Sequence, residues 1–229
     1  MVDISNISDD FKDEIRQILA VVKLVDGEPN STARQRVSTV NSSILLISSI
    51  FEQFIREIVT ECAVEIVRNA PNFASIPKSL PKSLWERSLR RLGRNKYGTD
   101  GFDAKDAQRF VENLDAFCIQ ENRSVGFISV VSDNDHNMRP REIDEIFARI
   151  GRNKYCSLVF GSSRFQKFFG ALDYRESRIL GINYLERFYI TRNTIAHSIR
   201  NTSGIGINDF ENYVEFFYIF SDESAKVLK

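Results

Sequence analysis

Hydrophobic residues recur along most of the chain at the three- and four-residue spacing of an amphipathic helix. In residues 8–25 this spacing predicts a first helix, with Ser8 or Asp9 as its N-cap. The predicted buried stripe of this helix consists of Phe11, Ile15, Ile18, Leu19 and Val22. Gly27 and Pro29 in the following turn end the helix.

A much longer helix is predicted over residues 32–69. Its apolar face shows the same helical spacing and consists of Ile47, Phe51, Phe54, Ile58 and Cys62. At the rise of an α-helix it would be roughly 55 Å long. We therefore expect it to be the central support of the fold.

Shorter elements are expected in the middle of the chain. Prolines 71, 77 and 81 indicate a loop, and helices are predicted over 82–92, 104–118 and 141–150, the first ended by Gly93 and the last by Gly151. Residues 121–138 look irregular, although 127–131 could form one short strand.

Two long helices are expected in the last quarter of the chain, one over residues 175–200 and one capped by Asn208 or Asp209. The second would bury Phe210, Tyr213, Val214, Phe217, Tyr218 and Phe220. The whole pattern predicts an all-α protein with long helices near both ends. We expect a single helical domain over residues 1–229, with an insertion of shorter helices at about 71–170.

One short motif occurs twice, as Arg91-Leu-Gly-Arg-Asn-Lys-Tyr97 and as Arg149-Ile-Gly-Arg-Asn-Lys-Tyr155. It is typical of a helix end, where a left-handed Gly and basic residues suit the last turn. The alternative is a pair of turns that contact phosphates. In that case the RNA-binding residues would include Arg94, Lys96, Arg152 and Lys154.

Composition narrows the class of protein. Lys and Arg number 31, as do Asp and Glu, which excludes a globally basic nucleic-acid binder but leaves room for a local basic surface. The hydrophobic fraction of 42% excludes disorder of the whole chain. The acidic, polar residues 1–14 do not resemble a signal peptide, and the uncharged stretch 37–51 is short and serine-rich for a membrane span.

The three cysteines lie far apart, which predicts neither a disulfide framework nor a zinc site. We therefore expect a cytoplasmic protein that does not associate with membranes. The only two histidines are His136 and His197. Asp133, Asp135 and His136 could ligate a divalent metal, but their polar segment is more typical of a solvated turn.

His197 belongs to a second polar cluster, on the predicted helix over 175–200. Asn193 lies four residues before His197 and shares its face, and the long side chain of Arg192 can reach toward the same side. Spacing alone favours a hydrogen-bonded core histidine beside a surface arginine.

The segment Arg192-Asn193-Thr194-Ile195-Ala196-His197 resembles the R-x4-H motif of the HEPN superfamily. Its setting is also similar, near the end of a long helix with another amphipathic helix after it. Residues 44–67 and 136–151 resemble the corresponding segments of the RiboL-PSP type of HEPN protein. The chain departs from many relatives at Ser198, where they have Gly, and Ser198 suggests that the helix continues toward Arg200.

The resemblance implies a HEPN-type helical bundle and a metal-independent endoribonuclease without a cofactor, whose active site is shared by the protomers of a homodimer. His197 would act in acid–base catalysis, Arg192 would bind the scissile phosphate, and Asn193 would orient the phosphate or the histidine. The products would carry 2′,3′-cyclic phosphate and 5′-hydroxyl ends.

Further expectations concern the surroundings of this site. Arg187 and Arg200 would extend the RNA-binding surface, and Ile190, Ile195 and Ile199 beside the motif suit a dimer interface. Such a protein would be a toxin or an antiviral defence effector, with a possible antitoxin or defence-system partner. Two alternatives are a non-catalytic HEPN module for dimerisation or for binding a nucleotide or RNA, and an unrelated helical scaffold in which Arg192 and His197 are structural.

Overall fold

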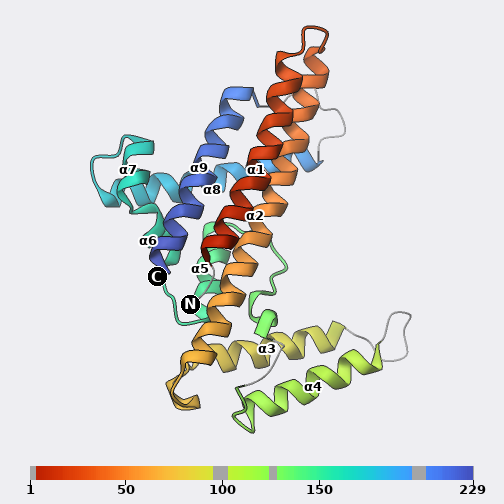
Figure 1. Cartoon of the computed structure of the whole chain (residues 1–229), viewed down its shortest axis with the longest axis vertical. Helices are drawn as coiled ribbons and strands as arrows, with labels where there is room; N and C mark the ends of the chain where they lie inside the picture. Colours follow the sequence, from red (N-terminus) through yellow and green to blue (C-terminus); the bar gives the residue numbers. More distant parts are fainter. Residues whose placement is uncertain (1–3, 95–102, 124–127, 198–204, 229) are drawn as a thin grey trace. The chain divides into compact units, whose positions relative to one another are not determined.

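The computed structural model describes residues 4–94, 103–123, 128–197 and 205–228. Within these ranges the chain forms helices and no strand, which confirms the predicted all-α class (Figure 1). The α-helices are α1 (Ile4–Gly27), α2 (Ala33–Asn69), α3 (Ser79–Arg94), α4 (Ala104–Cys118), α5 (Pro140–Arg149), α6 (Tyr155–Phe160), α7 (Ser163–Phe169), α8 (Tyr174–His197) and α9 (Ile207–Val227). Two short 3₁₀-helices, η1 (Phe73–Ser75) and η2 (Ile128–Ser132), connect them.

The described residues divide into two compact units. The first unit contains Arg56–His136 and Asp144–Lys154, apart from the residues outside the described ranges. The second unit contains the chain up to Ile55, Asn137–Ile143 and the part from Tyr155 onward. A single domain with an insertion at about 71–170 stays a prediction.

Aromatic rings form the core of the second unit. Phe11 of α1 stacks on Phe54 of α2 with ring centroids 4.3 Å apart, and Phe51 contacts Phe217 of α9 at 4.7 Å. The predicted faces of these helices are therefore confirmed, except that Ile18, Leu19 and Tyr218 are only half-buried. Burying one such ring stabilises the fold by about 2–3 kcal/mol, before conformational entropy is subtracted.

The helices α1 and α9 come from opposite ends of the chain and lie side by side (Figure 1). Ser8 is buried between them and hydrogen-bonds to the Ser221 hydroxyl. Ser8 was expected to cap α1, but the helix begins four residues earlier, at Ile4, so that prediction is wrong. A small hydroxyl pair at this position satisfies two polar groups that would otherwise be buried without partners.

Two expected helix boundaries also differ from the structure. The helix α9 begins after Gly206, which makes no side-chain capping bond, so Asn208 and Asp209 are not its N-cap. The helix α3 begins at Ser79 and so includes Pro81 in its first turn, where a missing N–H is tolerated.

The short helices α6 and α7 fall in residues 152–174, where the hydrophobic pattern predicted no particular element. Helix α6 is mostly apolar on all sides, so no amphipathic period marks it. It packs against α8 at Gly181, where an added Cβ would lie 2.5 Å from Cγ of Phe160. Glycine is therefore required for the close approach of these two helices.

The first unit is built on the part of α2 after Ile55 and on the neighbouring helices α3 and α4 (Figure 1). The helix α4 has the predicted bounds, and Asp103 caps it by accepting hydrogen bonds from two backbone N–H groups. Residues 128–131 lie in a 3₁₀-helix rather than in the possible strand, while residue 127 lies outside the described residues.

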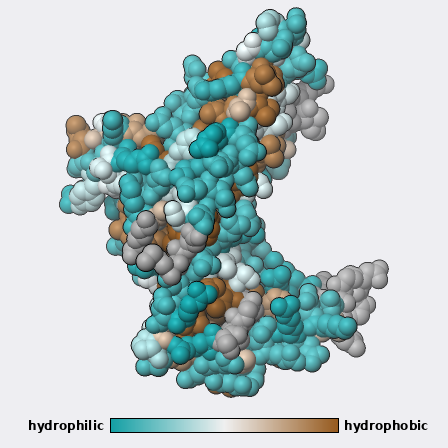
Figure 2. Space-filling model, viewed as in Figure 1, coloured by the Kyte–Doolittle hydropathy of each residue, from teal (hydrophilic) through white to brown (hydrophobic). Residues whose placement is uncertain are grey.

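On the face in Figure 2, hydrophilic residues cover most of the surface and hydrophobic ones gather in separate patches. Among the described residues, no helix has the length and apolar character needed to cross a membrane.

Candidate functional site

The polar cluster on α8 lies in the second unit, against α2 and the segment before α5. Arg192 is half-buried, and its Nε donates a hydrogen bond to Oγ of the buried Ser48 at 3.4 Å. Its Nη1 donates to Oδ1 of Asn193 at 3.2 Å. Among the described residues, no carboxylate forms an ion pair with Arg192, so its hydrogen-bond partners are neutral, and the carboxylate of the cluster, Glu52, lies next to Tyr189.

Asn193 is fixed by a second hydrogen bond. Its Oδ1 also accepts from Nδ2 of Asn137, at 3.0 Å. Because the amide is planar, the Asn193 NH₂ group points away from both Arg192 and Asn137. In the described part of the chain this NH₂ group has no hydrogen-bond partner, so it is a donor available to a ligand.

A buried tyrosine, Tyr189, lies next to the polar cluster. Tyr189 lies one helical turn before Asn193 and is fully buried, next to Glu52 of α2 and the backbone of Met138. Burial is the main cause that raises the pKa of Tyr189 well above its ordinary value, and the nearby Glu52 raises it further. The phenol therefore stays neutral and adds no charge of its own near Arg192.

His197 is the last described residue of α8, and its side chain is exposed. The interpretation of His197 as a core histidine is therefore wrong, and the half-buried Arg192 is the less exposed of the two side chains. Within the described residues, no hydrogen bond joins His197 to Arg192 or Asn193. Ser198, Ile199 and Arg200 lie outside those residues.

The other RNA-binding candidates do not all belong to the same unit. Arg187 is exposed on α8 in the second unit. Arg94, Arg152 and Lys154 are exposed in the first unit, and Lys96 lies outside the described residues. Arg94 is also ion-paired with Asp135, which compensates part of its charge.

The first arginine of each copy of the repeated motif contacts residues 131–135. Arg149 is only 8% exposed, and its Nη1 donates to the carbonyl oxygens of Val131 at 2.7 Å and Asp133 at 2.9 Å. Burial, with the nearby Arg87, lowers the pKa of Arg149 to about 10. Arg91 lies 3.6 Å from the Asp133 carboxylate and over the Phe110 ring. These arginines therefore have a structural role.

The glycines of the repeat do not share one conformation. Gly151 has a φ of 82° and follows the end of α5, as predicted. Gly93 lies inside α3, which continues to Arg94, so the prediction that Gly93 ends this helix is wrong. Two nearly identical motifs thus differ in backbone conformation at the glycine, because the helix continues through Gly93 and ends before Gly151.

The possible metal site at Asp133, Asp135 and His136 is not supported by the geometry. Asp135 is ion-paired with Arg94 and lies 3.9 Å from Arg90, while Asp133 is paired with Arg91. Among the described residues, no group of three or more His, Cys, Asp and Glu side chains could hold a metal ion.

Four contributors to the α8 cluster were not identified from the sequence: Ser48, Glu52, Asn137 and Tyr189. Ser48 and Glu52 are four residues apart on α2, which places two polar groups on one face of a mostly apolar helix. That spacing was the available signal for a polar contact. Asn137 had no such signal, because it lies in an irregular segment far from Asn193 in sequence.

Residues 9–229 match the family model described as RiboL-PSP-HEPN. The chain therefore belongs to the RiboL-PSP-HEPN family, which excludes the interpretation as an unrelated helical scaffold. Neither a search of curated proteins nor a search of solved structures found a match. The family assignment agrees with the all-α fold and suggests a nuclease or RNA-binding role.

Proposed function

We propose that the protein is a metal-independent endoribonuclease and that Arg192, Asn193 and His197 form its active site. The observation that supports this proposal is the setting of Arg192: its hydrogen-bond partners are neutral, no described carboxylate forms an ion pair with it, and an exposed histidine follows on the same helix. A structural arginine in a folded protein usually binds carboxylates or carbonyls, as Arg149 does here.

RNA cleavage by the adjacent 2′-hydroxyl needs a base, an acid and stabilisation of the charged phosphorane. His197 removes the 2′-hydroxyl proton, and the oxygen attacks phosphorus to close the 2′,3′-cyclic phosphate. Arg192 and the Asn193 NH₂ group stabilise the charge on the non-bridging oxygens. An acid donates a proton to the 5′-oxygen, which leaves as a 5′-hydroxyl.

The second proton-transfer group is supplied by a homodimer in this proposal. One motif has one histidine, and a two-fold axis near the motif brings two histidines and two arginines to one cleft. Ile190 supports an interface here, because it is 57% exposed on the motif helix, two residues before Arg192. Ile195, by contrast, is buried within the protomer and is unavailable for that interface.

The biological role that fits such an enzyme is a toxin or antiviral defence effector in the cytoplasm. Unregulated RNA cleavage harms the cell, so a cognate antitoxin or a defence-system partner would control it. Arg187, on the same helix as the motif, would add to the RNA-binding surface.

A second candidate function is a non-catalytic module that dimerises or binds RNA or a nucleotide. The observation that favours it is the exposed His197, whose ring has no orienting hydrogen bond among the described residues. General bases are commonly held by a third group.

RNA cleavage in EDTA distinguishes the two functions. We expect wild type to cleave and His197→Ala to lose about 100-fold or more of its activity, the typical contribution of a general acid or base. The matched control is His136→Ala, which removes the other exposed histidine and should leave cleavage unchanged. Binding without cleavage by folded wild type would favour the module, and equal loss in both variants would contradict the assignment of His197.

A further inference from the structure

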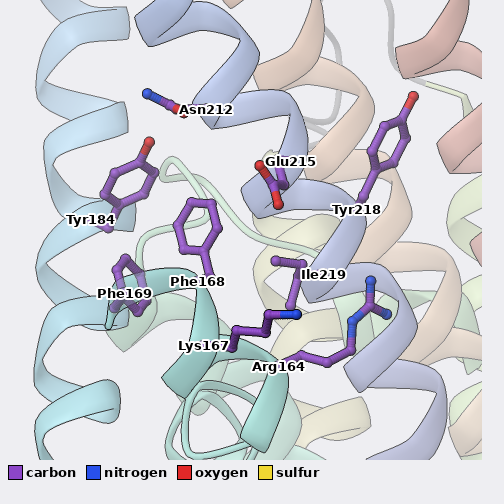
Figure 3. A pocket seen from close by; sticks show the side chains of 9 residues that line it. All are labelled: Arg164, Lys167, Phe168, Phe169, Tyr184, Asn212, Glu215, Tyr218 and Ile219. Atoms are coloured by element: carbon purple, nitrogen blue, oxygen red, sulfur yellow. The ribbon is translucent and has the colours of Figure 1, made fainter. Parts of the chain in front are cut away.

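A second hollow in the same unit has the composition of a ligand site. It is a cavity of about 800 Å³ between α7, α8 and α9, open to solvent (Figure 3). Tyr184, one of its lining residues, is eight positions before Arg192 on α8. That separation is about 12 Å along the helix. The other lining residues come from α7 and α9, whereas the partners of the motif cluster come from α2 and the segment before α5. The cavity is therefore distinct from the motif cluster.

Three half-buried aromatic rings form one wall of this cavity. Phe168 and Phe169 of α7 have ring centroids 4.9 Å apart, and Tyr184 lies 5.9 Å and 5.7 Å from them. In Figure 3 the Phe168 ring is seen between Tyr184 and Glu215. A flat ring can stack on such a partly exposed wall, because offset and edge-to-face arrangements of aromatic rings are favourable.

Cationic side chains line the cavity from α7. Arg164 and Lys167 are three residues apart, so they share one face of the helix, and both are exposed. Arg164 is ion-paired with Asp222, which also binds Lys12, and Lys12 in turn pairs with Asp9, so the charges of these four side chains balance. Lys167 has no ion pair among the described residues. This end of the cavity therefore suits a phosphate group.

A carboxylate and an amide line the cavity from α9. Glu215 and Asn212 are also three residues apart and exposed, and neither makes a side-chain hydrogen bond within the described ranges. An ionised carboxylate accepts two parallel N–H groups best. Among the common bases only guanine offers such a pair, its N1–H and N2–H, on one edge. Adenine, cytosine and uracil place an acceptor beside each donor.

We propose that this cavity binds a guanine nucleotide. The base stacks on the wall of Phe168, Phe169 and Tyr184, Glu215 accepts hydrogen bonds from its N1–H and N2–H, and Lys167 with Arg164 binds the phosphate. The ligand is either a free nucleotide or a guanosine within an RNA strand, since the same groups recognise both. The site does not depend on RNA cleavage.

Calorimetric titration of the full chain carrying His197→Ala tests the proposal without degradation of RNA. The probes are GMP, AMP, guanosine, and two short RNAs that differ by one G-to-A replacement. We expect GMP to bind at least 10-fold more tightly than AMP and than guanosine. If the protein prefers the G-containing RNA and does not bind GMP, the ligand is a guanosine within an RNA strand. Equal affinity for the G and A forms of both probes, or no binding of either, overturns the proposal.

Variants of exposed side chains keep the test independent of folding. Glu215→Gln should weaken GMP binding at least 10-fold and abolish the preference over AMP, whereas Lys167→Gln should weaken both nucleotides and leave guanosine unaffected. The matched control is Glu14→Gln, which removes an exposed carboxylate of α1 outside the cavity. Unchanged GMP affinity in Glu215→Gln overturns the role of the carboxylate and with it the guanine assignment.

Discussion

The arginines of the repeated motif in the first unit and Arg192 in the second unit are held in opposite ways. In the first unit Arg149 is buried on two carbonyl oxygens, and Arg91 and Arg94 bind Asp133 and Asp135. In the second unit Arg192 rests on the hydroxyl of Ser48 and the amide of Asn193. In the first arrangement the guanidinium groups hold residues 131–135 in place. In the second arrangement the guanidinium of Arg192 has no anionic partner and can bind a phosphate.

A high local content of arginine therefore does not locate an anion site. The sequence concentrates basic residues in the repeated motif, yet two of those arginines are engaged by acidic side chains and a third is buried. A guanidinium whose partners are neutral keeps its full attraction for a phosphate. By this criterion Arg192 is a better candidate for phosphate binding than Arg91, Arg94 or Arg149.

The largest effect should come from removing Arg192. We expect Arg192→Ala to lower the rate of RNA cleavage by about 100- to 1,000-fold, the usual consequence of losing one donor to a charged transition state. The matched variant Arg94→Ala, in the first unit, should change the rate by less than about 3-fold, which is within the effect of one surface charge. Similar losses in both variants would remove the distinction between the two kinds of arginine.

The free energy of unfolding, in contrast to the rate of cleavage, should depend most on an arginine of the first unit. Arg149→Ala leaves two buried carbonyl oxygens without their donor, so we expect the free energy of unfolding to fall by about 2–4 kcal/mol. Arg91→Ala, the equivalent change in the first copy of the motif, removes an exposed side chain and should lower it by less than about 1 kcal/mol. Denaturant titration measures both, and an equal effect would contradict the structural role of Arg149.

The close packing of α8 gives a smaller effect. Gly181→Ala forces a methyl group against the buried Phe160 ring and should destabilise the fold by about 1–3 kcal/mol. Gly93→Ala places its methyl group in open space on a helix, so it should stabilise by about 0.5–1 kcal/mol. Thermal unfolding of the pair shows the sign of each change, and stabilisation by Gly181→Ala would contradict the contact.

The smallest effect is the acid dependence of the Asp135 ion pair. Its hydrogen bond with Arg94 is the first cause that lowers the pKa of Asp135 below its ordinary value of 3.8. A lowered pKa means that the stabilising contribution is present above pH 4 and is lost as the pH falls further. Because Asp135 is exposed, the contribution is small. Asp135→Asn should flatten the stability curve between pH 4 and pH 2 slightly, and an unchanged curve would show that the pair contributes nothing.

The long helices could be predicted from the sequence because they bury one face over many turns. Phe51, Phe54 and Ile58 illustrate this, since they are spaced three and four residues apart on one face and all are buried. Boundaries were harder, because Ser8 and Asn208 have the chemistry of a cap but the helix start depends on what packs around them. Tertiary contacts override such local preferences.

The candidate site was predicted in part. Arg192, Asn193 and His197 lie on one helix, so their spacing along the sequence could be recognised. Their partners could not be recognised, because Ser48 and Asn137 come from distant segments that only the fold brings to α8. That the hydrogen-bond partners of Arg192 are neutral could therefore be seen only in the structure.

The central claim is that the 2′-hydroxyl of the RNA is the nucleophile and that no metal takes part. The most direct test is to map one cleavage position in EDTA and then to supply the same RNA with a single 2′-deoxynucleotide on its 5′ side. We expect 2′,3′-cyclic phosphate and 5′-hydroxyl ends on the normal RNA and no cleavage at the deoxy position. Continued cleavage there, with a 5′-phosphate on the product, would contradict the central claim.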